Sequence, residues 1–283
     1  MAVLGYYQSS VSSFPLCFKG FANYFMSTSE IILLFSAAVA GGAVNSVAGG
    51  GGFVAFPALL FTGMPPINAN ATGTVALWPG TLASTGAYRK ALSKALFKRL
   101  LPLIIITFTG SLAGSILLLK TPQLTFLKMV PWLLLGATLL FSFAGKITAW
   151  ASKHHGGRGP SGWAVAGVTV LQACVAIYIG YFGAGAGIVM LALLSMMNIE
   201  SIHSMNGLKT MLATCGNAVA VVVFIFAHAV YWPQALLMIG GSVLGGYGGA
   251  HYAQKLNPKT IRYIVIAIGG AMTVYFFWKT RGM

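Results

Sequence analysis

The sequence predicts an all-α, polytopic helical membrane protein built from two inverted repeats of about five segments each. Three observations lead to this fold class: 57% of the 283 residues are hydrophobic, only 7% are charged, and long apolar runs recur from Ile31 to Trp278. A soluble domain carries about 25% charged residues, so this chain lacks the side chains needed to cover a surface in water. Apolar runs of about 20 residues are typical of helices that cross a bilayer.

Ten apolar segments are expected to form helices. Eight are long enough to cross a hydrocarbon core of about 30 Å at about 1.5 Å per residue. Two short segments, 53–63 and 187–198, each follow a glycine cluster and are either short tilted crossings or re-entrant half-helices. In chain order the segments are 31–48, 53–63, 70–88, 100–119, 126–149, 163–182, 187–198, 204–229, 233–254 and 261–278.

The scarcity of acidic residues excludes several kinds of chemistry. The chain has two acids, Glu30 and Glu200, and no aspartate, which leaves no Ser-His-Asp triad and no carboxylate cage for Ca²⁺. Cys17, Cys174 and Cys215 form no CxxC pair, and the scattered histidines fit no metal spacing. We therefore expect no catalytic residues, no metal and no cofactor.

The basic residues set the expected orientation. A net charge of +15 would indicate nucleic acid in a soluble protein, but here the basic residues lie between apolar segments, as the positive-inside rule requires of cytoplasmic loops. They follow segment 70–88, lie near 146–158 and recur at 255–262, whereas the turn at 229–233 has none. This pattern needs an odd number of crossings in each half. Both short segments are therefore counted as crossings, in a multi-pass protein of the inner membrane with both termini outside.

The predicted domain organisation follows from these segments. Met26 reads as a natural beginning of the chain, and Ser29 is a candidate N-cap of the first helix, with Glu30 in its first turn. The predicted units are an N-terminal tail, 1–29; a first transmembrane repeat, 30–149; a cytoplasmic linker, 150–162; and a second transmembrane repeat, 163–283.

An internal repeat with an offset of 135–136 residues supports the two-unit organisation. Residues 50–53 align with 185–188, and residues 70–74 align with 206–210, each of the latter pair being an Asn-x-x-x-Thr motif. An odd number of crossings per repeat inverts the second copy, which is the architecture of many secondary transporters, with the binding site near the midplane where the copies meet. The alternative is that the small residues only allow helices to pack closely.

Several of these motifs resemble the TauE/SafE sulfite and organosulfonate exporter family. The resemblance covers about 31–278 and implies export of small sulfur-containing anions such as sulfite, sulfonates or sulfoacetate. The matching residues are Gly49-Gly50-Gly51-Gly52-Phe53-Val54-Ala55-Phe56-Pro57, Gly63-Met64-Pro65-Pro66, Ala69-Asn70-Ala71-Thr72-Gly73-Thr74, Phe182-Gly183-Ala184-Gly185-Ala186-Gly187 and Asn217.

An oxyanion in a site of low dielectric constant needs hydrogen-bond donors and positive potential. Two glycine-opened short helices supply both through their free N–H groups and dipole ends. Lys209 lies within a membrane segment, where it either contacts the anion or extends to the cytoplasmic interface; the asparagines and threonines either donate to the anion or bond neighbouring helices. The candidate substrate-binding residues are Gly50, Gly51, Gly52, Asn70, Thr74, Gly185, Gly187, Asn206, Lys209, Thr210 and Asn217.

Three other functions compete with anion export. A porter for another small solute fits the same architecture. An intramembrane enzyme is disfavoured because the sequence contains no HExxH or GxSxG motif, and an assembly protein is disfavoured because no soluble domain is present to dock a partner. The expected partners are a small anionic substrate and the lipid bilayer, with no nucleic acid; a homodimer is left open.

Overall fold

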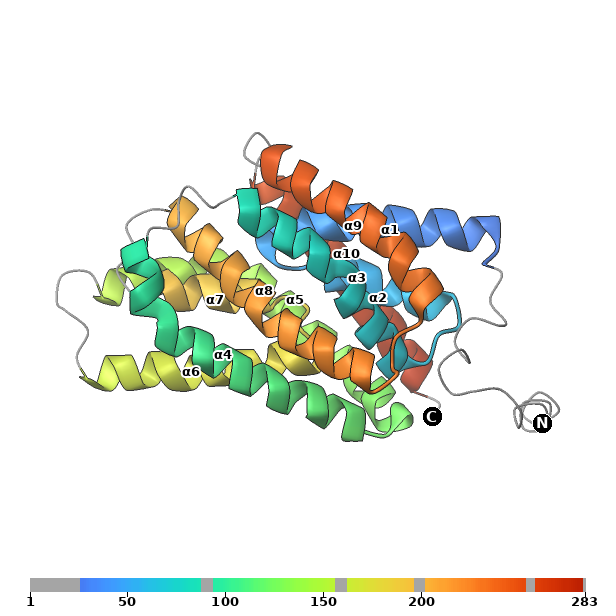
Figure 1. Ribbon diagram of the computed structural model, residues 1–283, viewed down its shortest axis with the longest axis horizontal. Helices are drawn as coiled ribbons and strands as arrows, with labels where there is room; N and C mark the ends of the chain where they lie inside the picture. The colour runs from blue at the N-terminus through green and yellow to red at the C-terminus, as the bar shows by residue number, and fades with distance from the viewer. Residues whose placement is uncertain (1–25, 88–93, 156–161, 196–201, 253–257, 282–283) are drawn as a thin grey trace.

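The computed structural model describes residues 26–87, 94–155, 162–195, 202–252 and 258–281. This part of the chain is all-α, as predicted, and its helices run alongside one another (Figure 1). Each of the ten expected segments corresponds to one helix, and the two short segments are helices of 10 residues each. The helices are α1 (Thr28–Ala48), α2 (Gly52–Phe61), α3 (Pro66–Ala87), α4 (Lys94–Lys120), α5 (Gln123–His155), α6 (Gly162–Tyr181), α7 (Ala186–Ser195), α8 (Ile202–Phe226), α9 (Trp232–Tyr252) and α10 (Pro258–Thr280).

The N-cap of the first helix lies two residues earlier than predicted. The N-cap is Ser27, not Ser29, because Ser27 and Glu30 form a capping box. The Glu30 amide donates to Ser27 Oγ over 3.3 Å, and the Ser27 amide donates to Glu30 Oε2 over 2.8 Å. The Ser-x-x-Glu spacing that this motif requires places the cap at Ser27, so α1 begins inside the predicted tail; residues 1–25 of that tail lie outside the described residues.

Two helices extend beyond the apolar segments that predicted them. Helix α4 begins at Lys94 rather than near residue 100, and α5 ends at His155 rather than at 149, inside the predicted linker. No glycine or proline lies between 150 and 155, and Gly156 and Gly157 follow, so nothing in that stretch stops a helix. Hydropathy marks the part of a helix inside the membrane and not its polar ends.

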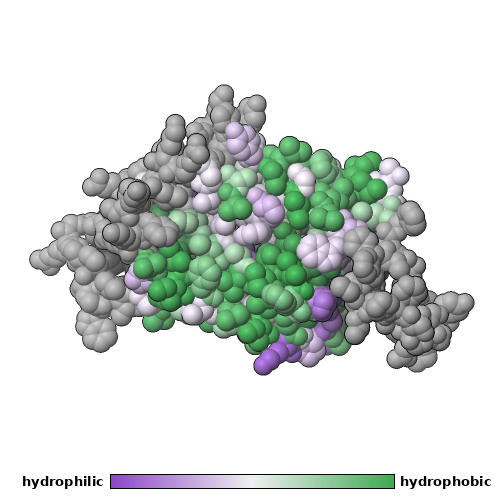
Figure 2. Space-filling view, in the orientation of Figure 1, coloured by the Kyte–Doolittle hydropathy of each residue, from purple (hydrophilic) through white to green (hydrophobic). Residues whose placement is uncertain are grey.

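The surface of the bundle is apolar and many small polar residues are inside. Large hydrophobic side chains such as Trp132 (65% exposed), Val170 (64%) and Val274 (69%) face outward, and the described part of the surface in Figure 2 is largely hydrophobic. Ser84, Ser111 and Ser242 are fully buried. Such extensive exposed apolar surface is unstable in water, so it is expected to contact lipid.

Three helices are long and apolar enough to cross a bilayer, counted over the part of the chain whose side chains are described: Thr28–Ser46, Leu101–Lys120 and Ser204–Phe226. Together with the exposed apolar surface and the other long helices of the bundle, these three spans indicate a multi-pass membrane protein.

Close packing of small residues joins the helices in two seams. In the seam between α4 and α6, a methyl group at Gly180 would overlap the carbonyl oxygen of Ser111, and one at Gly114 would overlap that of Ile177. In the seam between α1 and α9, a methyl group at Gly245 would overlap the carbonyl oxygen of Val39. Helices in lipid gain contact area in this way when small residues line their crossings.

A polar cluster holds three segments at one end of the bundle. Asn68 Nδ2 donates to Ala229 O over 3.0 Å, Gln123 Oε1 accepts from the Ile67 amide over 2.9 Å, and the Tyr231 amide donates to Thr72 Oγ1 over 3.0 Å. These bonds bring together the start of α3, the start of α5 and the turn before α9. Because α3, α5 and α9 all leave this end, their last residues lie toward the opposite end (Figure 1).

Candidate functional site

Two helix breaks lie inside the bundle, one between α1 and α2 and one between α6 and α7. Gly49 ends α1 with φ +74°, and Gly183 and Gly185, between α6 and α7, have φ +73° and +81°. Side chains are strained in this left-handed conformation, which glycine adopts freely. Glycine is therefore required by the backbone of the breaks at positions 49, 183 and 185.

The two breaks are in direct contact. The Gly185 amide donates to Gly49 O over 3.2 Å. A methyl group built on Gly52 would lie 3.1 Å from Ala184 Cβ, and one on Gly49 would lie 2.7 Å from Gly187 Cα. The predicted convergence of the two glycine-opened helices on one place is thus observed.

Two cavities flank this contact. We name the first the asparagine cavity; it is about 50 Å³ in volume and is lined by Gly52, Asn70, Gly73, Thr74 and Leu77, with Phe56 and Phe182 at its border. We name the second the lysine cavity; it is about 30 Å³ and is lined by Thr81, Gly187, Lys209, Thr210 and Ala213. Asn45, Gly183 and Asn217 line both.

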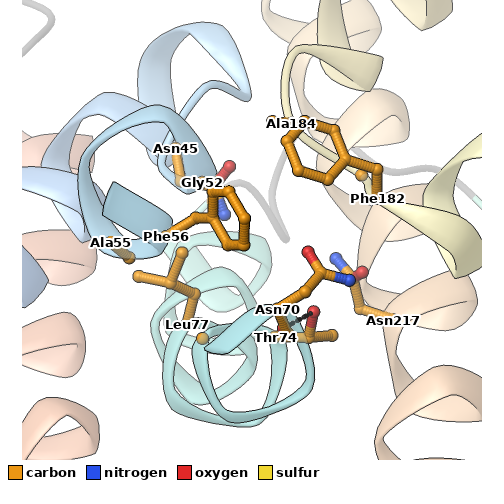
Figure 3. A pocket seen from close by; sticks show the side chains of 12 residues that line it. Asn45, Gly52, Ala55, Phe56, Asn70, Thr74, Leu77, Phe182, Ala184 and Asn217 are labelled. Carbon is orange, nitrogen blue, oxygen red and sulfur yellow. Dashed lines mark hydrogen bonds between the residues drawn. The ribbon is translucent and has the colours of Figure 1, made fainter. Parts of the chain in front are cut away.

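Both cavities suit a small solute. Each exceeds the roughly 10–15 Å³ that one water molecule needs, and both are far below the roughly 300–1,000 Å³ of sites for drug-sized ligands. Figure 3 shows Asn70 and Asn217 side by side below the space that Phe56 and Phe182 border. The lining therefore combines amide groups with aromatic walls.

One backbone amide at each opening has no hydrogen-bond acceptor among the described residues. In the first turn of α2, the Phe53 and Val54 amides donate to Gly50 O and Gly51 O over 3.0 and 3.1 Å, and the Gly52 amide has no acceptor in the described part of the chain. In α7 the Ala186 amide donates to Gly183 O over 3.3 Å. The Gly187 amide likewise lacks an acceptor among the described residues. Gly52 and Gly187 each line a cavity, at a helix start where N–H groups can stabilise an anion.

Asparagine side chains complete the polar lining. Asn70 Nδ2 donates to Tyr181 O over 3.1 Å and so covers a free carbonyl at the end of α6. Asn45 Oδ1 accepts from the Gly51 amide over 3.4 Å, which leaves its NH₂ group free to donate. Asn217 makes no hydrogen bond with the described part of the chain, and its half-buried amide borders both cavities.

Lys209 brings the positive charge. Its side chain is 1% exposed and lines the lysine cavity, two turns into α8. Burial inside the bundle favours a role at the cavity over extension to the membrane interface, the alternative that the sequence left open. None of the described residues lining either cavity is acidic, so a negatively charged solute meets no carboxylate there.

The two threonines of the Asn-x-x-x-Thr motifs are engaged within their own helices. Thr74 Oγ1 donates to Asn70 O and Thr210 Oγ1 donates to Asn206 O, both over 2.8 Å. Their hydroxyl hydrogens are therefore committed to the backbone, although both residues line cavities. They shape the site rather than supply donors to an anion.

The structure brings seven of the eleven predicted residues to the cavities: Gly52, Asn70, Thr74, Gly187, Lys209, Thr210 and Asn217. Four others line neither cavity. Gly51 packs against α1, since a methyl group there would overlap Gly41 O. Gly185 bonds Gly49, Gly50 accepts from Phe53, and Asn206 lies one turn before Thr210. These four act in the backbone of the breaks or in packing.

Sequence reasoning missed several lining residues. Thr81 aligns with Asn217 at the repeat offset of 136, so the repeat itself could have found it. Phe56 and Phe182 lie in the motifs that open the short helices, but nothing in the sequence distinguishes them from other apolar residues. Asn45 lines the cavities because α1 ends beside it, which is a property of the three-dimensional fold.

A bundle of membrane helices in which two broken helices meet at a buried polar cavity defines a membrane transporter. The chain belongs to the family described as Sulfite exporter TauE/SafE, whose model matches residues 33–276. This is a family of transporters and not of enzymes, and similar proteins are named probable membrane transporter proteins.

Similar proteins cover most of the chain. A "Probable membrane transporter protein" of Haemophilus influenzae is 28% identical over 86% of this chain and 92% of its own length. "Probable membrane transporter protein YfcA" of Escherichia coli is 26% identical over 93% of this chain and 95% of its own length. "Probable membrane transporter protein ORF9" of Sinorhizobium sp is 27% identical over 86% of this chain and 91% of its own length. No solved structure matches the chain.

Proposed function

We propose that the chain exports small sulfur-containing anions, such as sulfite, sulfonates and sulfoacetate-like molecules, across the inner membrane. The observation that carries this proposal is the meeting of two glycine-opened helices beside a cavity lined by buried Lys209. The description of the family, which names a sulfite exporter, supports the choice of substrate. The roles of the lining residues follow from their chemistry.

The cavities offer an oxyanion hydrogen-bond donors and positive charge in place of the water that hydrates it in solution. Amide groups of Gly52, Gly187 and Asn217 donate hydrogen bonds, and the N-terminal ends of α2 and α7 contribute partial positive charge. Lys209 adds a full positive charge in a place shielded from water, where a charge pair is stronger than at a surface. A cation would find no carboxylate among the described lining residues.

We further propose that 30–149 and 163–283 are inverted repeats, joined by the linker after α5. If a two-fold axis relates the two repeats, a residue that lies on the axis contacts the equivalent residue of the other repeat. Trp78 and Thr214, whose indole Nε1 and carbonyl oxygen lie 3.0 Å apart, are 136 residues apart. Gly185, the equivalent of Gly50, hydrogen-bonds to the adjacent Gly49. The separation of Trp78 and Thr214 equals the sequence offset in this part of the repeat and supports a two-fold axis through their contact, with the contact between the glycine clusters close to the same axis.

The packing of the helices supports the same symmetry. Helix α1 packs on α9 as α4 packs on α6, and α3 packs on α9 as α8 packs on α4. If helices five apart in chain order are equivalent, the contact between α1 and α9 corresponds to the contact between α6 and α4. In the same way, the contact between α3 and α9 corresponds to the contact between α8 and α4. Helices α3 and α8 pack on each other, as do α5 and α10, and the same equivalence maps each of these two contacts onto itself.

The function is tested by flux into proteoliposomes containing the purified full chain. We expect uptake of labelled sulfite and methanesulfonate above that of empty liposomes, with no uptake of a neutral amino acid such as alanine. Uptake of the amino acid without uptake of either anion would favour a porter for another small solute. Absence of any flux from folded protein would contradict transport by this chain alone.

The orientation is tested by cysteine accessibility in a variant with Cys17, Cys174 and Cys215 replaced by serine. Cysteines at positions 94 and 232 should label from opposite sides, because Trp232 begins α9 at the polar-cluster end and α4 begins at the other. The basic character of the loops predicts that position 94 is cytoplasmic. Position 158, which lies outside the described residues, should label with position 94. Labelling of all three from one side would contradict five crossings per half.

A further inference from the structure

The asparagine cavity and the lysine cavity share several equivalent lining positions. At the repeat offset, Thr74 of the first corresponds to Thr210 of the second, and Leu77 corresponds to Ala213. Gly52 and Gly187, which stand at the starts of the two short helices, also correspond. Three lining positions of the two cavities are therefore equivalent in the two repeats, although Asn206, the equivalent of Asn70, lines neither cavity.

One position makes the two cavities electrostatically different. Lys209 in the lysine cavity corresponds to Gly73 in the asparagine cavity. The asparagine cavity thus has amide donors and no charged residue among its described lining, whereas the lysine cavity adds a cation that is 1% exposed. An anion in a water-excluded site gains more from a charged donor than from a neutral one.

Asn217 connects the two cavities. It lines both, its side chain makes no hydrogen bond with other described residues, and an amide NH₂ group offers two donors. An anion leaving one cavity can therefore keep a hydrogen bond to Asn217 while it enters the other.

We propose that the two cavities are successive stations for the same small oxyanion, with Lys209 making the lysine cavity the tighter station and Asn217 lining the passage between them. This inference rests on the proposed function and adds a second binding site and an order of affinity. Relocating the lysine to the other cavity should therefore relocate the tighter station.

The experiment measures sulfite binding to the full chain and locates its analogue selenite by anomalous X-ray scattering. Lys209→Met should weaken sulfite binding by about 30-fold or more, and adding Gly73→Lys should restore most of the loss. A methyl group at Gly73 would meet only the side-chain atom Leu59 Cδ1, at 3.3 Å, so the substitution is sterically tolerable. Gly73→Met with Lys209→Met adds similar bulk without charge and should restore nothing.

Selenite should lie in the lysine cavity of the wild-type chain and in the asparagine cavity of the relocated variant. Leu77→Lys with Lys209→Met, which places the lysine on another lining residue, provides a second relocation if Gly73→Lys does not fold. Asn217→Ala should weaken binding by a similar factor in the wild-type and relocated chains.

Failure of both folded relocations to bind more tightly than Lys209→Met would overturn the inference, as would selenite at the same place in both chains. A wild-type chain that binds no sulfite would instead contradict the proposed function.

Discussion

Lys209→Met is expected to abolish export of sulfite. The side chain lines the lysine cavity and is almost fully buried, and no acidic residue is found among the described lining. Removing one member of a desolvated charge contact costs about 2–5 kcal/mol, which corresponds to a loss of affinity of roughly 30-fold or more. Sulfite binding to the purified variant and flux in proteoliposomes measure the effect.

Two further variants separate charge from geometry and from general damage. Lys209→Arg keeps the positive charge but replaces a compact ammonium by a planar guanidinium, so its loss should be smaller. Lys120→Met removes a lysine from the exposed end of α4 and should leave binding unchanged. If Lys209→Met binds sulfite as tightly as the wild type, the anion is held by the helix openings and asparagines alone.

The fold was largely predictable because the segments of a chain that cross a bilayer must be both apolar and helical. Every apolar segment corresponds to a helix, and the glycine clusters at 49–52 and 183–187 mark the two breaks. Helix ends were less predictable, since they depend on local bonds that hydropathy does not report. The capping box of Ser27 with Glu30 and the polar extension of α5 to His155 are the examples.

The site was predictable to the level of segments but not of every residue. The repeat indicated both openings, yet Gly51 packs on α1 and the adjacent Gly52 lines a cavity, because successive residues at a helix start point in different directions. Likewise, because Lys209 lies near a helix end, the sequence allowed its side chain to point either into the site or toward the cytoplasmic interface. Only the packing of α7 and α8 around the cavity decides between them.

Gly180→Val is expected to destabilise the protein strongly, independently of any effect on the site. A methyl group at Gly180 would overlap Ser111 O and lie 2.8 Å from the Ser115 amide nitrogen, so α4 and α6 would have to move apart. Both neighbours are backbone atoms, which cannot rotate away as a side chain can. Overpacking of this kind costs about 1–3 kcal/mol, occasionally more, and should lower Tm by roughly 2–12 °C.

The matched control is Gly136→Val in α5, where an added methyl group would have no neighbouring atom within 4 Å. Valine has a higher helix propensity than glycine, so propensity alone would stabilise both variants slightly. A fall in Tm confined to Gly180→Val, measured by thermal unfolding in the same detergent, therefore reports the close crossing of α4 and α6. Equal Tm values for the two variants would mean that the helices cross at a greater distance, and the small residues of this seam would then need another explanation.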